Sequence, residues 1–384
     1  MLTWELRCSV CDHRSPSSAL TGVCPACQQP MLAHYSGPAP LRDRLRPRWD
    51  MWRYADAMPL LPDEDPVSLG EGMTPLRDCP ALAREIGVGR LWIKDEGINP
   101  TASFKARGLS AAVTRARAHG IPGLVVPTAG NAGAALAAYG AAAGLPVRVF
   151  APRTTPPAIL ATIVALGADL QLVEGHIGDA GKAARAFAAS DGWFDVSTLR
   201  EPYRTEGNRT LGLELVEQLG WRLPIAIVYP MGGGEGIIGM WKVFGEMRDW
   251  GWLPAEARTR LIVAQASGCA PLVRAFHAGA EKAEPWENPS THASGLRVPG
   301  PLGDRLVLRA LRDTGGSAAS VDEETMRRDT LRLSRATGID AAPEGGCALA
   351  VTELLRRDGT LGADDEVVVF NTGSGASYRV PAFD

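Results

Sequence analysis

The chain has 384 residues, and 45% of them are hydrophobic, which is enough for two lobes with a substantial core and a small appendage. The formal net charge is −3 and the isoelectric point lies near 6.1, so there is no basic surplus to attract nucleic acid or an anionic membrane. No apolar run is long enough to span a bilayer and the first residues lack a signal-peptide pattern, so we expect a cytoplasmic protein.

Two cysteine pairs lie near the N-terminus, Cys8-x-x-Cys11 and Cys24-x-x-Cys27. Two such knuckles separated by a short, turn-rich segment are typical of a four-cysteine zinc ribbon. Four thiolates fill the coordination shell of Zn²⁺ and leave no place for water, so the predicted role of the metal is structural. A pair of reducible disulfides and a degenerate, metal-free knuckle are the alternatives. The other three cysteines are isolated, and we expect them to be small buried apolar residues: Cys79, Cys269 and Cys347.

The sequence divides into four predicted segments. Residues 1–36 form the zinc ribbon, and residues 37–104 form an N-terminal arm and the start of a large domain. The arm is rich in Pro, Arg and Trp up to about residue 65, which predicts an extended segment with one helix. Residues 105–205 form a smaller α/β lobe, and residues 206–384 form the large α/β domain.

From residue 91 onward, short β-branched runs alternate with alanine-rich stretches, such as the predicted helix over 132–143. This alternation predicts a two-lobed α/β fold with mostly parallel sheets. Strands are predicted at residues 91–93, 124–126, 147–150, 170–173, 225–229, 261–264 and 367–370.

The stretch from Asn99 to Gly108 reads Asn-Pro-Thr-Ala-Ser-Phe-Lys-Ala-Arg-Gly and follows the predicted strand 91–93. It places Lys105 in the first turn of a predicted helix, where Phe104 shields the side-chain amine. A primary amine held in this way suits Schiff-base chemistry with a carbonyl compound.

In open α/β sheets ligands bind beyond the carboxyl ends of the strands, and three glycine-rich turns have that position. The first, residues 128–133, places Asn131 at a helix start, where its amide can donate to a ligand or simply cap the helix. The last, residues 371–375, contains Thr372, whose hydroxyl can face a heterocycle nitrogen or belong to an ordinary polar turn.

The middle turn lies between the predicted strand 225–229 and a helix predicted from residue 237. It has four glycines in five positions, an arrangement that forms a nest of backbone N–H groups suited to a phosphate. No GK[ST] sequence follows and the spacing is not G-x-G-x-x-G, so a nucleotide is disfavoured. The nest comprises Gly232, Gly233, Gly234, Glu235 and Gly236.

A lysine, an asparagine turn, a phosphate nest and a late hydroxyl turn match the four anchoring needs of pyridoxal 5′-phosphate. These needs are the aldehyde carbon, the phenolic oxygen, the phosphate and the pyridine nitrogen. A hydroxyl cannot hold that nitrogen protonated as a carboxylate does, so the cofactor becomes a weaker electron sink. This favours β- or γ-elimination and replacement over transamination.

Over nearly its whole length the chain resembles the threonine synthases of the fold type II, or tryptophan-synthase-β-like, family of pyridoxal-phosphate enzymes. The motifs that carry the resemblance are residues 99–108, 201–207, 232–242, 265–276, 294–299 and 370–375. The resemblance implies that Lys105 forms the Schiff base, Asn131 lies beside the phenolic oxygen, the loop 232–236 surrounds the cofactor phosphate, and Thr372 faces the pyridine nitrogen. It also implies that 206–384 is the cofactor-binding domain and that the protein is a homodimer.

The resemblance implies a lyase of amino-acid biosynthesis that converts O-phosphohomoserine and water to threonine and phosphate. Lys105 would move protons among Cα, Cβ and Cγ of this amino-acid substrate. Arg204 matches a position that holds the substrate phosphate, and the Thr128 hydroxyl would add a second contact. A surface ion pair of Arg204 with Glu201 or Glu206 is the alternative.

Several positions depart from the family's pattern, including Ala102, Ala106, Ala132 and Met231. The most important is Glu235, because a carboxylate among phosphate donors repels the ligand, and we expect its side chain to point away from the cofactor phosphate. These departures leave open a related β-replacement or β-elimination on another amino acid, as in cysteate synthases, dehydratases or ammonia lyases. A non-catalytic binding protein built on the same fold is the third hypothesis.

Overall fold

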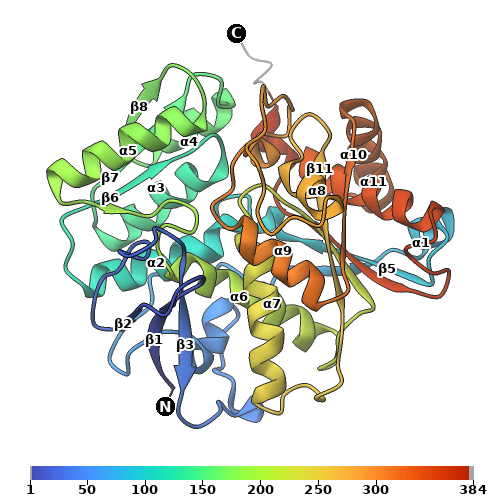
Figure 1. Cartoon of the computed structure of the whole chain (residues 1–384), viewed down its shortest axis with the longest axis horizontal. Coiled ribbons are helices and arrows are strands. Elements are labelled where there is room, and N and C mark those ends of the chain that lie inside the picture. Colours follow the sequence, from blue (N-terminus) through green and yellow to red (C-terminus); the bar gives the residue numbers. More distant parts are fainter. Residues whose placement is uncertain (1, 380–384) are drawn as a thin grey trace.

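The computed structural model describes residues 2–379, which fold into three separate sheets surrounded by helices (Figure 1). The N-terminal sheet is antiparallel and has the order β2-β1-β3, formed by β1 (Thr3–Cys8), β2 (Arg14–Pro16) and β3 (Met31–Ser36). Its buried side chains, Leu6 and Ala33 among them, share one apolar cluster with Ala106 and Leu109 of the main body. The ribbon is therefore packed onto the rest of the protein.

The large sheet has six strands, which are parallel except for the antiparallel pair at one edge. Apolar clusters cover both of its faces, which explains why its strands are nearly continuous apolar runs. In spatial order the strands are β12 (Ser317–Val321), β11 (Arg260–Ala266), β10 (Ala226–Pro230), β13 (Glu366–Asn371), β5 (Arg90–Asp95) and β4 (Leu76–Asp78).

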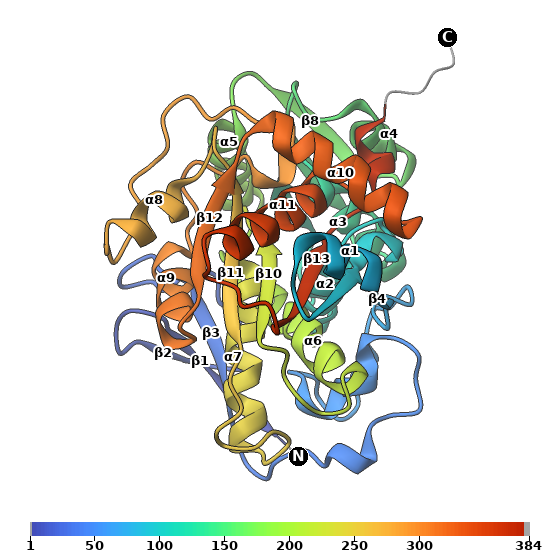
Figure 2. The same cartoon turned by 90° about the vertical axis from the view of Figure 1, so that its right-hand side faces the viewer.

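Figure 2 looks onto the face of this sheet that carries α1 (Pro80–Ile86), α10 (Glu323–Thr337) and α11 (Pro343–Arg357). The opposite face carries α6 (Tyr203–Gln218), α7 (Glu235–Asp249), α8 (Pro271–His277) and α9 (Asp304–Asp313).

The small sheet is fully parallel and lies on the other side of the molecule (Figure 1). Its order is β8 (Asp169–Val173), β7 (Val147–Pro152), β6 (Leu124–Pro127) and β9 (Phe194–Asp195). The helices that belong with it are α2 (Lys105–Ala118), α3 (Asn131–Ala143), α4 (Pro157–Ala165) and α5 (Ile177–Asp191).

The helices α2 and α6 cross at close range between the large sheet and the small sheet. A Cβ on Gly207 would lie 2.1 Å from the carbonyl oxygen of Arg107, and one on Gly108 would lie 3.0 Å from that of Arg204. The two glycines therefore allow backbone contact, which brings the start of α2, with Lys105, next to the start of α6.

The predicted fold class is confirmed, and the seven predicted strands are all present. Outside the ribbon, the prediction missed three short strands, β4, β9 and β12. In the arm, the structure has two 3₁₀ helices, Arg42–Arg44 and Met51–Ala57, in an otherwise irregular path. The small sheet lies within residues 105–205, and the predicted segment boundaries stay predictions. Within residues 2–379, no helix combines the length and apolarity needed to cross a membrane.

Candidate active site

Lys105 is the first residue of α2, directly after a turn that is tied to the last strand of the large sheet. The N–H of Phe104 donates to the carbonyl of Thr372 at 3.1 Å, and the N–H of Ser374 donates to that of Ala102 at 2.9 Å. The Phe104 ring lies 4.4 Å from the Lys105 Nζ and packs edge-on against Tyr229. These contacts fix the lysine beside the C-terminal turn, 371–375, although the two are far apart in sequence.

The glycine nest connects β10 to α7 and has the geometry of an anion site. A Cβ on Gly232 would lie 2.1 Å from the Gly295 carbonyl oxygen, and one on Gly233 would lie 2.6 Å from the Thr198 side chain. Gly234 has φ +94°, in the left-handed region that favours glycine. Within residues 2–379, the N–H groups of Gly232, Gly233 and Gly234 donate to no protein acceptor. Three free donors at a helix start fit a phosphate group.

The predicted cofactor residues line one cavity, which has a volume of about 60 Å³. It is lined by Lys105, Asn131, Thr372 and all five residues of the nest. Asn131 is the first residue of α3, and no side chain caps that helix, so the simple capping role is not observed. An amine, an amide, a phosphate nest and a hydroxyl thus meet in one place, and this set fits pyridoxal phosphate.

A buried ionic triad lies at this cavity. The Glu235 carboxylate oxygen Oε2 is 3.2 Å from Lys105 Nζ and 2.8 Å from an Arg204 NH2 nitrogen. The Glu235 side chain is fully buried, and that of Arg204 is 1% exposed. Burial and the positive charge of Arg204 both lower the pKa of Lys105, and the Glu235 carboxylate raises it. Burial has the largest effect, so the pKa of Lys105 lies below its usual value. Burial alone raises the pKa of Glu235, but the two cations outweigh it and lower the pKa, so the carboxylate is ionised.

The side chains of the two predicted substrate residues, Arg204 and Thr128, bind other groups of the protein. Arg204 also donates to the Val196 carbonyl at 2.7 Å, and its ion pair is with Glu235 instead of Glu201 or Glu206. Glu201 accepts the backbone N–H of Arg204 at the start of α6. The Thr128 hydroxyl donates to the Gly130 carbonyl at 2.7 Å and does not line the cavity.

Sequence reasoning missed Glu344, a buried carboxyl in the first turn of α11 that lines the same cavity. It accepts hydrogen bonds from the Tyr378 hydroxyl and from the Gly295 N–H, and burial raises its pKa. Only the Pro-Glu pair at a helix start marked it in the sequence, and such pairs are common in ordinary helices. Glu206 lies outside this cavity and pairs with Arg209 and Lys242.

The four N-terminal cysteines form a cluster in which all sulfur atoms lie within 4.8 Å of one another. The Sγ atoms of Cys8 and Cys27 are 3.4 Å apart, and those of Cys11 and Cys24 are 3.6 Å apart. Tetrahedral Zn–S bonds imply about 3.8 Å between sulfurs, so the cluster is compatible with a metal ion. The three isolated cysteines are buried as predicted.

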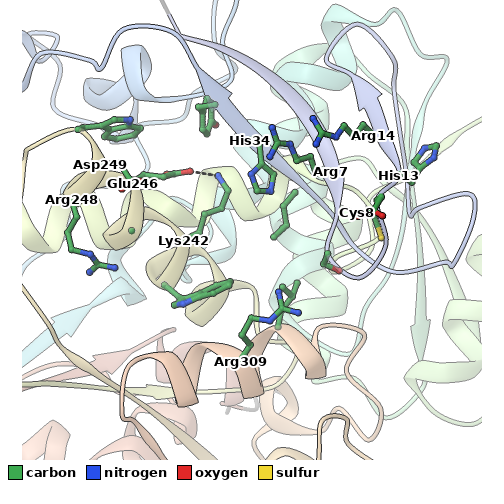
Figure 3. A pocket seen from close by; sticks show the side chains of 18 of the residues that line it. Arg7, Cys8, His13, Arg14, His34, Lys242, Glu246, Arg248, Asp249 and Arg309 are labelled. Carbon is green, nitrogen blue, oxygen red and sulfur yellow. Dashed lines mark hydrogen bonds and ion pairs between the residues drawn. The ribbon is translucent and has the colours of Figure 1, made fainter. Parts of the chain in front are cut away.

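A larger cavity, of about 950 Å³, lies between the ribbon and the helices α7 and α9. Figure 3 shows Lys242 and its partner Glu246 in this cleft, with Arg309 and the ribbon residues Arg7 and Arg14 around it. Three acidic side chains offset the five basic ones that line it, and neither the nest nor Lys105 reaches it. The candidate active site is therefore the smaller cavity at Lys105.

The fold and this site define an α/β enzyme of the pyridoxal-phosphate-dependent class. The chain belongs to the family described as "Pyridoxal-phosphate dependent enzyme", whose pattern matches residues 67–373. It is 32% identical to a threonine synthase of Methanosarcina acetivorans over 96% of this chain and 91% of the relative. It is also 32% identical to the Methanocaldococcus jannaschii threonine synthase, over 85% and 80% of the two chains.

Solved structures share the fold. The processed form of a threonine deaminase from Solanum lycopersicum has a TM-score of 0.67 at 20% identity, covering 88% of this chain and 94% of that one. A diaminopropionate ammonia lyase from Escherichia coli has a TM-score of 0.69 at 19% identity, covering 80% and 86%. The predicted family, fold type II, is confirmed, and the protein is a pyridoxal-phosphate-dependent lyase related to threonine synthases.

Proposed function

We propose that the protein converts O-phosphohomoserine and water to threonine and phosphate. The observation that carries the proposal is the meeting of Lys105, the nest and Thr372 in one cavity of a chain whose relatives are threonine synthases. Bound pyridoxal phosphate supplies an electron sink for negative charge on the substrate carbons.

Each residue of the cavity has a separate proposed role. Lys105 would hold the aldehyde carbon of the cofactor, Asn131 its phenolic oxygen and Thr372 its pyridine nitrogen, while the nest 232–236 would bind its phosphate. The Lys105 amine would remove and return protons at the substrate carbons. The Phe104 ring, which packs against Tyr229, covers part of the Lys105 amine.

Arg204 is the proposed contact for the substrate phosphate. Its Nε is buried without a hydrogen-bond partner, so one donor of the guanidinium is free for a ligand. Thr128 lies in the turn that precedes α3, and its hydroxyl would have to leave the Gly130 carbonyl to reach the same phosphate.

A second candidate is β-elimination on an amino acid without a phosphate. The observation that favours it is the ion pair of Arg204 with Glu235, which neutralises the guanidinium that the phosphate needs. A hydroxy amino acid would leave this pair intact.

The deciding experiment incubates the holoenzyme with O-phosphohomoserine and measures released phosphate and threonine. Equal amounts of the two products, absent in a Lys105→Ala variant, are expected. Turnover of O-phosphoserine or a hydroxy amino acid in place of O-phosphohomoserine supports the second candidate. A purified protein that shows no cofactor absorbance, even after pyridoxal phosphate is added, supports the non-catalytic hypothesis.

We also propose that the four-cysteine cluster binds structural Zn²⁺. The sulfur separations near those of a tetrahedral site support this. Metal analysis should find one zinc per chain in the wild type and less than half of that in a Cys24→Ser variant. Hydrogen exchange in that variant should rise over residues 3–36 and stay unchanged over the large sheet. A wild-type protein purified without zinc contradicts the proposal.

A further inference from the structure

The carboxylate of Glu235 is in an unusual place for a phosphate nest, because α7 begins with it and its side chain is turned toward Lys105. One oxygen, Oε2, contacts both Lys105 Nζ at 3.2 Å and Arg204 at 2.8 Å. The other oxygen, Oε1, is buried and has no hydrogen-bond partner among residues 2–379. The carboxylate is therefore committed to the two cations, which come from α2 and α6.

The three charges are held by separate elements, so their spacing is set by helix packing. Lys105 opens α2, Arg204 lies in the first turn of α6 and Glu235 opens α7. The close crossing of α2 and α6 at Gly108 and Gly207 brings the lysine and the arginine to the same oxygen of Glu235. A single buried carboxylate thus contacts two cations, of which Arg204 is buried and Lys105 is partly exposed.

The other ionisable groups near this triad do not take over the role of Glu235. Glu344, from α11, lines the cavity but accepts from Tyr378 and Gly295. Glu201, which precedes α6, accepts backbone N–H groups of that helix. Tyr229, from β10, is buried with its hydroxyl unpartnered, and burial raises its pKa well above the usual value. Glu235 is the one carboxylate within hydrogen-bond reach of Lys105 among residues 2–379.

We propose that Glu235 is a positioning residue for Lys105: it directs the amine into the cavity and stabilises its ammonium form, while Arg204 keeps Glu235 ionised. The proposal rests on the proposed function only in that Lys105 is the reactive lysine. When Lys105 takes a proton from the substrate, the adjacent carboxylate stabilises the resulting ammonium, which makes the lysine a stronger base. Arg204 opposes this effect because its positive charge repels the ammonium.

The geometry predicts opposite changes for two variants. In Glu235→Gln, the side chain keeps its shape but loses the charge that stabilises the ammonium, so the pKa of Lys105 falls. In Arg204→Gln, Glu235 serves Lys105 alone, so the pKa of Lys105 rises. A purely structural role for the two residues would not produce shifts of opposite sign.

The test uses the full chain freed of cofactor and adds pyridoxal, the aldehyde without the phosphate, so that the nest is not required. The unprotonated Lys105 amine condenses with the aldehyde and releases water, and the rate is followed by absorbance from pH 6 to pH 11. The midpoint of the rate profile reports the pKa of the amine. The midpoint of Glu235→Gln should fall by about one pH unit, which is tenfold in the protonation equilibrium, and that of Arg204→Gln should rise.

The control variant is Glu324→Gln, which removes an exposed carboxylate of α10 that does not line the cavity, and its midpoint should match the wild type. Unchanged midpoints in both test variants overturn the proposal. If Glu235→Gln does not fold, as judged by circular dichroism, Glu235→Thr and Arg204→Gln still decide it. A Lys105→Arg variant that condenses as fast as the wild type contradicts the assignment of the lysine itself, and that failure is distinct from the first.

Discussion

At the scale of single residues, the nest depends on glycine for space more than for flexibility. A side chain at position 232 would overlap the backbone carbonyl of Gly295, which cannot rotate away as a side chain can. The loop would then have to shift, and the three free N–H groups would no longer converge on one phosphate.

We therefore expect Gly232→Ala to weaken the binding of pyridoxal phosphate at least tenfold, or about 1.4 kcal/mol. An absorbance titration of the cofactor-free chain measures this directly. Gly178→Ala is the matched control, because nothing lies within 4 Å of a Cβ at that position, and it should bind as tightly as the wild type. Equal affinities in the two variants would contradict the role of the nest.

Sequence reasoning found the residues that meet in the cavity because strand ends determine where they lie. Lys105, the nest and Thr372 follow β5, β10 and β13 of the large sheet, whose carboxyl ends gather at one edge, while Asn131 follows β6 of the small sheet. The direction of the Glu235 side chain was beyond the sequence, because it depends on how α2, α6 and α7 pack. Whether Glu235 also avoids the cofactor phosphate stays a prediction, as do the roles assigned to the other site residues.

At the scale of elements, a buried ionic network joins α2, α6 and β5 beneath the site. Arg107 pairs with Glu96 at 2.7 Å and with Glu214 at 2.9 Å, and Glu214 also pairs with Lys94. All four side chains are fully buried. Such a network holds the first turn of α2, and with it Lys105, only while every member keeps its charge.

This network predicts a loss of stability in acid. Burial alone raises the pKa of Glu214, but Arg107 and Lys94 outweigh it and lower the pKa to about 2. Because the folded pKa lies below the unfolded value, Glu214 contributes its full stabilisation above about pH 4.5 and loses it as the pH falls toward 2. The loss is on the order of 3 kcal/mol.

Denaturant unfolding between pH 5 and pH 2.5 measures this dependence. The free energy of unfolding of the wild type should fall more steeply over this range than that of Glu214→Gln, which no longer titrates. Glu324→Gln, an exposed change on α10, should keep the wild-type slope. Parallel curves for the wild type and Glu214→Gln would show that the carboxylate does not act in this way.

The strands that were predicted from the sequence are mostly apolar runs, and the strands that were missed are not. β12 reads Ser-Ala-Ala-Ser-Val, which has few residues typical of strands, and it forms only because β11 offers a free parallel edge. β9 has two residues and is likewise defined by its neighbour, β6. In both cases tertiary pairing decides the structure, and local sequence does not reveal it.

At the scale of the whole molecule, the stretch 41–69 leaves several large apolar side chains exposed. Trp49 is 80% exposed, and Leu41, Leu61 and Leu69 are all more than 40% exposed. Exposed apolar residues gathered in one segment are typical of a surface that meets a partner. In the expected homodimer, we therefore expect the arm to lie across the interface.

Sedimentation equilibrium should therefore give twice the 40.7 kDa mass of one chain. Trp49→Ser should shift the population toward the monomer, because the largest exposed apolar side chain of the arm is removed. Ser190→Ala, a change at an exposed position of α5, should leave the mass unchanged. A wild-type monomer at all concentrations contradicts the expectation, and so does a Trp49→Ser dimer of undiminished affinity.

The proposed active site depends most directly on which amine carries the cofactor. The chain has only five lysines, so borohydride reduction of the holoenzyme followed by peptide mapping gives an unambiguous answer. We predict that the reduced cofactor is attached to Lys105 alone. Attachment to Lys94, Lys182, Lys242 or Lys282 would contradict the active site described here.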